Sequence, residues 1–271
     1  IAFAVNHLDA IGGIQTTASH NPAQYNGFKI CRAHAKPVGM GTGLEQIQVV
    51  VEAIEENPSD AVRGTEESID LWDAYRVHVF EYLDPLIQSG EVTIRAAVDA
   101  SNGMAGTMVP KLFHGVKGLE LIEINFENDK GTFVHEPNPL VEANLKQTIE
   151  AVKANDCNLG ICFDGDADRC FFVDGSGEFI AGDFITSLLA EEFLLKQPGA
   201  KIVYDVRASY AVKDMVARHG GTALMNRVGH AFFKKRMREE NAIFGGEVTG
   251  HYYFRDNFFA DNGLIPALLI L

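Results

Sequence analysis

Residues 159–169 carry the pattern that decides the fold, and they read Leu159-Gly-Ile-Cys-Phe163-Asp164-Gly-Asp-Ala-Asp168-Arg169. The first five residues form a short apolar run, which predicts a buried β-strand. Three carboxylates at alternate positions and then an arginine follow directly: Asp164, Asp166, Asp168 and Arg169. In open α/β sheets, ligands bind beyond the carboxyl ends of the strands. The stretch therefore predicts an α/β sheet with a functional site at its edge.

Helical and strand patterns alternate on both sides of this stretch. Apolar residues spaced as one helix face predict helices over residues 44–54, 69–86, 138–152, 182–196, 210–218 and 232–240. Short β-rich runs predict strands over residues 94–98, 119–124, 171–173, 178–180, 202–206 and 243–244, with a hairpin turn at 174–177. Strands that alternate with helices imply parallel sheets covered on both faces. We expect consecutive α/β domains with mixed, mostly parallel sheets covered by helices.

The ends of the elements and the domains carry their own signals. Asn57-Pro58 is expected to end the first helix, and Asn138-Pro139 to begin the third with Asn as cap and Pro in the first turn. Asp261 is expected to cap a last helix that runs to Leu271. Composition shifts near residues 92 and 198 predict three domains, over 1–92, 93–198 and 199–271.

Composition limits the partners. The chain has 271 residues and a net charge of −14, whereas a nucleic-acid partner needs a basic face. No apolar run approaches the roughly 18 residues of a spanning helix, and no signal pattern opens the chain, so no membrane partner is expected. The four cysteines show no zinc or CxxC spacing and fit a reducing cytoplasm: Cys31, Cys157, Cys162 and Cys170. The sequence is silent on oligomeric state.

The acidic loop has several possible functions. Three carboxylates offer the hard oxygen ligands that suit Mg²⁺, although a solvated acidic turn is an alternative. An EF-hand does not fit, because its sixth position holds Arg169 and its twelfth Gly175. A phosphatase of the haloacid-dehalogenase type, with Asp164 as nucleophile, also places D-x-D after a buried strand. Asp168 stands where that pattern expects Thr or Val, which disfavours it.

A second segment presents a hydroxyl group. Thr17-Ala-Ser-His-Asn-Pro22 places Ser19 on a loop between Gly12-Gly13 and a proline. A serine hydroxyl is a weak nucleophile unless a base or a metal assists it, and His20 and Lys29 are the nearby candidates. Taken alone, Ser19 is better interpreted as an ordinary loop serine, on residue frequency. A hydroxyl nucleophile and a hard-cation site in one chain indicate phosphoryl transfer.

The serine segment, together with Asn26-Gly-Phe-Lys29 and the acidic loop, resembles the active-site motifs of the α-D-phosphohexomutases, the family that contains phosphomannomutase and phosphoglucomutase. The resemblance runs from the first residues to the last. It implies that Ser19 is phosphorylated at rest and that its phosphate binds Mg²⁺ beside the three carboxylates, Asp164, Asp166 and Asp168. It also implies that His20 and Lys29 act as general acid/base or neutralising groups and that Arg169 approaches the transferring phosphate.

Sugar contacts follow from the same resemblance. Gly245-Gly-Glu-Val-Thr-Gly-His251 is similar to the loop that reads the sugar. The resemblance implies that Glu247 and Thr249 bind ring hydroxyls and that His251 approaches the reacting end. Thr249 replaces a serine and keeps the hydroxyl. Asp205-Val-Arg207 and Gly229-His230 match two further ligand-contacting turns, so Arg207 and His230 are expected substrate contacts.

The implied reaction interconverts a hexose 1-phosphate and its 6-phosphate, with mannose or glucose as the sugar and hexose 1,6-bisphosphate as intermediate and activator. The resemblance also implies a fragment without the start of the first domain and without a fourth domain that clamps the distal phosphate, so we expect weak substrate binding. Two alternatives stay open: a Mg²⁺-dependent phosphatase or phosphotransferase with an Asp nucleophile, and a non-catalytic phosphosugar-binding remnant.

Overall fold

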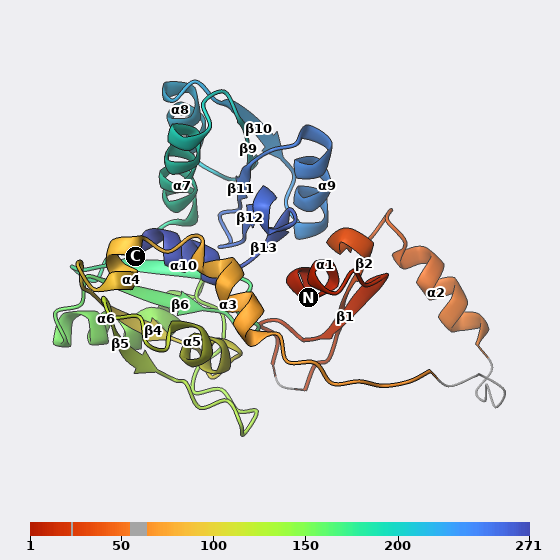
Figure 1. Cartoon of the computed structure of the whole chain (residues 1–271), viewed down its shortest axis with the longest axis horizontal. Coiled ribbons are helices and arrows are strands. Elements are labelled where there is room, and N and C mark those ends of the chain that lie inside the picture. The colour runs from red at the N-terminus through yellow and green to blue at the C-terminus, as the bar shows by residue number, and fades with distance from the viewer. Residues whose placement is uncertain (23, 55–63) are drawn as a thin grey trace.

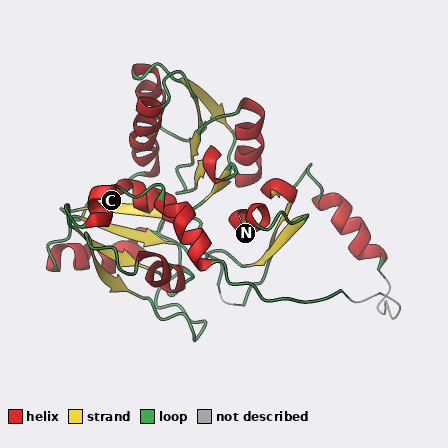
Figure 2. Ribbon diagram, viewed as in Figure 1, coloured by secondary structure: helices red, strands yellow, loops and turns green. Residues whose placement is uncertain are grey.

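A computed structural model describes residues 1–22, 24–54 and 64–271 of the chain. Three sheets with associated helices follow one another along the chain, and the third group stands above the second in the view of Figure 1. Figure 2 shows helices beside every sheet, so the predicted mixed α/β class is confirmed. Every helix in these three ranges is too short or too polar to cross a lipid bilayer.

The first sheet is small and antiparallel, with strand order β1-β2-β3, so it departs from the expected parallel pairing. Its elements are α1 (Ala2–His7), β1 (Gly12–Thr16), β2 (Phe28–Arg32), a 3-10 turn (Ala33–Ala35), β3 (Lys36–Pro37) and α2 (Leu44–Ala53).

The predicted helix α2 is confirmed, yet none of its residues is buried. Asn57-Pro58, its expected end, lies outside the described residues. The loop between β1 and β2 carries Ser19.

The helical pattern predicted over residues 69–86 forms two helices, α3 (Trp72–Phe80) and α4 (Pro85–Ser89). Asp84 breaks the pattern, because its side chain accepts a hydrogen bond from the backbone N–H of Leu86 at 2.7 Å and so caps α4. Pro85 takes the first position of α4, where a missing N–H costs nothing.

The second sheet has strand order β5-β4-β6-β7-β8. Its strands are β4 (Ile94–Asp99), β5 (Leu119–Ile124), β6 (Leu159–Phe163), β7 (Cys170–Asp174) and β8 (Phe179–Ile180). Parallel pairing joins β5, β4 and β6, and antiparallel pairing adds β7 and β8 through the predicted hairpin. The associated helices are α5 (Ala105–Phe113) and α6 (Lys146–Ala154), whereas α7 (Gly182–Lys196) packs against the third group, described below (Figure 1). The carboxyl end of β6 therefore lies beside that of β4 and delivers the acidic loop.

The predicted helix start at Asn138-Pro139 is wrong. The Asn138 side chain accepts a hydrogen bond from the backbone N–H of Leu140 at 3.3 Å, which closes a local turn. Val141 then adopts extended angles (φ −88, ψ 114), and a 3-10 turn over Glu142–Leu145 leads into α6. Asx-type turns compete with helix caps for the same side chain, so the sequence signal marked a turn rather than a helix.

The third sheet has strand order β10-β9-β11-β12-β13. Its strands are β9 (Lys201–Asp205), β10 (Thr222–Asn226), β11 (Phe244–Gly246), β12 (Tyr252–Phe254) and β13 (Ala260–Asp261). Its other elements are α8 (Tyr210–Arg218), α9 (His230–Glu240) and a 3-10 turn (Arg255–Asn257). Parallel strands β10, β9 and β11 are extended by antiparallel β12 and β13. The last helix, α10 (Leu264–Ile270), returns to the second sheet and packs on α3 and β7.

One hydrophobic core runs through the second and third sheets. It contains Val98 and Phe163 from the second sheet and Ile202 and Phe244 from the third, all of them fully buried. The shared core fixes the position of the carboxyl end of β6 relative to that of β11, so loops from different sheets can form one site. The domain boundaries near residues 92 and 198 stay predictions.

Candidate active site

The acidic loop joins β6 to β7 and is almost completely buried. Asp164 is 0% exposed and Asp166 8% exposed. Arg169, at the end of the loop, is 3% exposed and donates from Nε to Asp164 Oδ2 at 2.8 Å. Burial, followed by the charge of Asp168, raises the pKa of Asp164 despite this contact with arginine. Carboxylates packed this closely need positive charge nearby.

The serine loop lies against the acidic loop. Ser19 has a left-handed backbone (φ +56), a conformation that non-glycine residues seldom adopt. Thr17 links the two loops through its hydroxyl group. The hydroxyl accepts a hydrogen bond from the Ser19 backbone N–H at 2.8 Å and donates one to Asp166 Oδ2 at 2.9 Å. A hydroxyl of the serine loop thus holds that loop directly on the acidic loop.

The Ser19 hydroxyl meets a carboxylate and an imidazole. Its Oγ lies 3.5 Å from Asp164 Oδ2, to which it donates, and 3.2 Å from His20 Nδ1. Burial, followed by the positive charge of Arg169, lowers the pKa of His20, so its imidazole is neutral at neutral pH. A neutral imidazole nitrogen at this distance is able to take up or return a hydroxyl proton.

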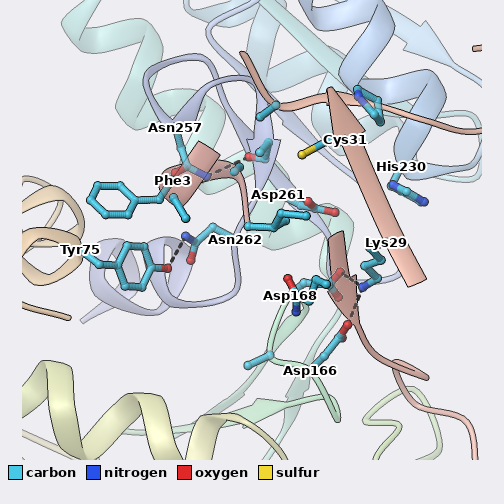
Figure 3. A pocket seen from close by; sticks show the side chains of 18 of the residues that line it. Phe3, Lys29, Cys31, Tyr75, Asp166, Asp168, His230, Asn257, Asp261 and Asn262 are labelled. Atoms are coloured by element: carbon cyan, nitrogen blue, oxygen red, sulfur yellow. Dashed lines mark hydrogen bonds and ion pairs between the residues drawn. The ribbon is translucent and has the colours of Figure 1, made fainter. Parts of the chain in front are cut away.

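Lys29 supplies positive charge to the acidic loop. Its Nζ lies 2.6 Å from Asp166 Oδ2 and 2.5 Å from Asp168 Oδ2 (Figure 3). Burial by itself lowers the pKa of Lys29, but the charges of Asp168 and Asp166 outweigh it and raise the pKa. In this arrangement Lys29 neutralises charge on the two carboxylates.

The carboxylates of the loop fit a divalent cation. Asp164, Asp166 and Asp168 each offer an oxygen, and these oxygens lie within 4.8 Å of one another. Among the described residues, Oδ1 of Asp166 and Oδ1 of Asp168 are buried without a hydrogen-bond partner. Carboxylate oxygens with unused lone pairs are ligands that Mg²⁺ prefers. The residues present are thus able to hold Mg²⁺.

The sugar-loop candidates lie between β11 and β12, next to the acidic loop. Arg169 and His251 form an antiparallel bridge, and the backbone N–H of Cys170 donates to the Gly250 carbonyl at 3.0 Å. His251 Nδ1 lies 3.8 Å from Asp168 Oδ1. Burial lowers the pKa of His251, but the neighbouring carboxylates outweigh it, and the net shift is upward. These contacts place His251 at the same centre as Ser19.

Asp261 belongs to this centre and not to the helix cap that the sequence predicts. The Asn262 side chain caps α10 by accepting from the backbone N–H of Leu264 at 2.8 Å. Asp261 instead lies 2.7 Å from Lys234 Nζ and 3.3 Å from His251 Nδ1. Adjacent Asp and Asn residues are both good caps, and nothing in the local pattern tells which one turns toward the helix.

Arg207, Glu247 and His230 form the outer part of the arrangement. Arg207 donates from Nε to both oxygens of Asp205 at 3.0 Å, and its guanidinium lies 4.0 Å from Glu247 Oε2. His230, at the start of α9, lies 3.4 Å from Lys234 Nζ, and burial, followed by the charge of Lys234, lowers the pKa of His230 to about 4. No hydrogen bond or ion pair among the described residues joins Arg207 to the acidic loop. Thr249 is half-buried in the loop that carries Glu247.

A cavity of about 480 Å³ opens beside these groups. Lys29, Asp166, Asp168 and His230 line one side, and the aromatic side chains Phe3, Trp72 and Tyr75 line another. Figure 3 shows Lys29 between the two carboxylates and Tyr75 across the cavity, where the Asn262 amide donates to its hydroxyl. A volume of this size is enough for a small organic ligand.

The chain matches family models described as phosphoglucomutase/phosphomannomutase alpha/beta/alpha domain I over residues 1–58, domain II over 75–177 and domain III over 181–271. It is 44% identical to a phosphomannomutase of Escherichia coli (strain K12), with 100% of this chain and 60% of that protein covered. It is 42% identical to a phosphomannomutase of Vibrio cholerae, with 100% and 58% covered.

Solved structures with a similar fold carry related descriptions. A phosphoglucomutase/phosphomannomutase family protein from Burkholderia thailandensis matches with a TM-score of 0.84 and 33% identity, over 96% of this chain and 54% of that one. A putative phosphomannomutase from Thermus thermophilus matches with a TM-score of 0.84 and 25% identity, over 99% and 60%. The chain spans about 60% of the length of the E. coli relative. It belongs to the phosphoglucomutase/phosphomannomutase family, the α-D-phosphohexomutases.

Proposed function

We propose that this chain carries the catalytic centre of a phosphohexose mutase, in which Ser19 carries the phosphoryl group between O1 and O6 of a hexose. The observation that supports this most directly is the position of the Ser19 hydroxyl, 3.2 Å from His20 Nδ1 and 3.5 Å from Asp164 Oδ2. A nucleophile beside a neutral imidazole and a carboxylate site for a cation is the arrangement that serine-based phosphoryl transfer needs.

The reaction has two half-reactions that mirror each other. In the first, the P–O bond to Ser19 breaks and a P–O bond to the free hydroxyl of a hexose monophosphate forms, which gives a hexose 1,6-bisphosphate. The sugar hydroxyl loses its proton to a base, and the Ser19 oxygen takes one up. The bisphosphate then reorients, and Ser19 accepts the other phosphoryl group by the reverse steps.

The side chains around Ser19 have separate roles in this proposal. His20 takes and returns the proton of the Ser19 hydroxyl, and His251 handles the proton of the sugar hydroxyl. Lys29 and Arg169 place positive charge where the transferring phosphoryl group carries negative charge, which is the main contribution of most such sites. Mg²⁺ held by the acidic loop and by the phosphate on Ser19 would supply further positive charge to that group.

Substrate recognition is assigned to the outer groups. Glu247 and Thr249 bind ring hydroxyls, while Arg207 and His230 contact the phosphosugar. The named relatives are phosphomannomutases, so mannose phosphates are the first substrates to test and glucose phosphates the second. The partner is a small phosphosugar and not a nucleic acid or a membrane. A cytoplasmic location stays a prediction.

Intact-protein mass spectrometry with peptide mapping tests the proposal. After incubation with Mg²⁺ and glucose 1,6-bisphosphate, we expect one phosphate on Ser19 and none in Ser19→Ala. Ser68→Ala, at an exposed position, is the matched control and should still be phosphorylated. A wild-type chain that never carries phosphate would contradict the proposal and would favour the non-catalytic remnant.

The same variant separates the proposal from an Asp-nucleophile enzyme. An aspartyl nucleophile keeps activity in Ser19→Ala, whereas a serine enzyme loses it. The structure gives this alternative less support, because Asp164 is 0% exposed and its Oδ2 already accepts from Arg169 at 2.8 Å. Hydrolysis of hexose bisphosphate by Ser19→Ala with phosphate found on Asp164 would reverse this preference.

A further inference from the structure

Both carboxylate oxygens of Glu247 are held, one by a residue of β12 and the other by the turn before α9. Glu247 follows β11 directly and is 1% exposed. Its Oε1 accepts from the hydroxyl of Tyr253, and its Oε2 accepts from the backbone N–H of Gly229 at 3.2 Å. The Glu247 carboxylate is thus oriented before any ligand arrives. Each carboxylate oxygen has two lone pairs, so each keeps one for a further donor.

Tyr253 is itself held rigidly. It lies on β12 opposite Gly245 of β11 and is 0% exposed. Its ring stacks on Phe233 of α9 at 5.0 Å and on His251 at 6.2 Å between ring centroids. Burial, followed by the charge of Glu247, raises the pKa of Tyr253 well above its usual range, so its hydroxyl remains a donor. A close-packed ring of this kind leaves its hydroxyl little freedom to move.

We infer that Tyr253 is a positioning residue of the mutase site, which holds the Glu247 carboxylate toward the sugar hydroxyls and supports the His251 ring at the same time. This inference rests on the proposed function, since it gives Glu247 a sugar as ligand. A carboxylate fixed in advance does not lose side-chain freedom on binding, so the hydroxyl of Tyr253 strengthens binding of the sugar. It also sharpens the discrimination between sugars that differ at the hydroxyl facing Glu247.

The neighbouring tyrosine provides a matched control. Tyr252 is also 0% exposed, but side chains alternate along a strand, so it faces the opposite side of the sheet. Its ring stacks on Phe244 at 6.5 Å between centroids. Its hydroxyl is buried without a hydrogen-bond partner in the part of the chain that the structure describes. Tyr252→Phe therefore removes a buried oxygen from the same strand and leaves Glu247 untouched.

Calorimetric titration of the 271-residue chain with mannose 1-phosphate and with glucose 1-phosphate tests the inference. We expect Tyr253→Phe to weaken binding of the preferred sugar about tenfold, because one hydrogen bond to a charged group is lost. The dissociation constants for the two sugar phosphates should also come closer together. Tyr252→Phe should bind within about twofold of wild type, with an unfolding midpoint no lower than that of Tyr253→Phe.

A double-variant cycle with Glu247→Ala makes the test specific, because alanine leaves no acceptor for the Tyr253 hydroxyl. If Tyr253 acts through Glu247, adding Tyr253→Phe to Glu247→Ala should cost little more than Glu247→Ala alone. Full additivity, or a Tyr253→Phe protein that binds both sugars as wild type does, would overturn the inference. So would a wild-type chain that binds neither sugar. If Ser19 never carries phosphate, the proposed reaction is wrong. The binding measurements still test the role of Tyr253 in that case, because they do not depend on phosphoryl transfer.

Discussion

A Cβ atom added to Gly165 would lie 2.2 Å from the carbonyl oxygen of Ser19. The serine loop and the acidic loop come from different sheets, and their backbones touch at this glycine. No side chain fits between them, because real Cβ contacts are far longer than this distance. The closeness of the two loops is what brings the Ser19 hydroxyl to the carboxylate of Asp164.

Gly165→Ala should therefore separate the two loops. We expect it to abolish phosphorylation of Ser19 by glucose 1,6-bisphosphate and to lower the free energy of unfolding by about 1–3 kcal/mol, the usual cost of overpacking. Intact-protein mass spectrometry and urea unfolding measure the two effects. Gly64→Ala is the control, because a Cβ there meets nothing within 4 Å. Normal phosphorylation of Gly165→Ala would show that the loops do not need this contact.

Mg²⁺ should stabilise the folded chain through the acidic loop. Binding at a free concentration about 100 times the Kd contributes about 2.7 kcal/mol, which raises the unfolding midpoint. Asp166→Asn should lose most of this rise, since it removes a ligand with an unpartnered oxygen. Asp129→Asn, an exposed position in the same part of the chain, should keep it. Calorimetry with Mg²⁺ and with EDTA measures the rise, and equal rises in both variants would place the cation elsewhere.

The pair of Lys234 and Asp261 should contribute strongly to stability. Their side chains are 13% and 8% exposed, and the two atoms lie 2.7 Å apart. Removing one partner, as in Lys234→Met or Asp261→Asn, should cost about 3–5 kcal/mol because the other charge stays buried. The double variant should cost less than the sum.

Lys235 offers the comparison for this pair. Lys235 and Glu239 are 61% and 56% exposed and 3.8 Å apart, so Lys235→Met should change stability by at most about 1 kcal/mol. Urea unfolding at neutral pH gives the free energy of unfolding of the four variants, which are Lys234→Met, Asp261→Asn, their double variant and Lys235→Met, each relative to wild type. Similar losses for Lys234→Met and Lys235→Met would mean that solvent reaches the Lys234 pair.

Stability should depend on pH through His135. Its Nε2 lies 3.1 Å from Asp99 Oδ2, and this hydrogen bond raises the pKa of His135 in the folded state. The folded protein thus holds the proton more tightly than the unfolded chain, whose histidine has a pKa of about 6.5. The stabilisation is complete below about pH 6.5 and disappears as pH rises through the folded pKa.

His135→Gln should consequently lose more stability, relative to wild type, at pH 6 than at pH 8. Urea unfolding at both pH values checks this. His114→Gln is the control, because His114 is exposed and its side chain makes no hydrogen bond or ion pair among the described residues. A loss for His135→Gln that is equal at the two pH values would show that the contact with Asp99 is not charge-dependent.

The primary structure alone determined the elements with strong local patterns and the identity of the reactive groups. The apolar runs of β4, β6 and β9 are buried along most of their length, and α8 buries one face through Val212 and Val216, so their patterns were sufficient. Strands β10 and β12 were missed because β10 is only partly buried and β12 is three residues long, so neither gives a clear pattern. The serine segment and the acidic loop were found because their residue types and spacing are unusual.

Tertiary structure decided how these groups meet. The approach of Ser19 to Gly165, the turn of Asp261 toward Lys234, and the hydrogen bond from the Gly229 N–H to Glu247 all join residues from separate segments of the chain. Local propensity says nothing about such pairs, because their geometry depends on how whole sheets pack around the shared core. The reactive groups were identified from the sequence, and packing of the three sheets determined the distances between them that make a candidate site.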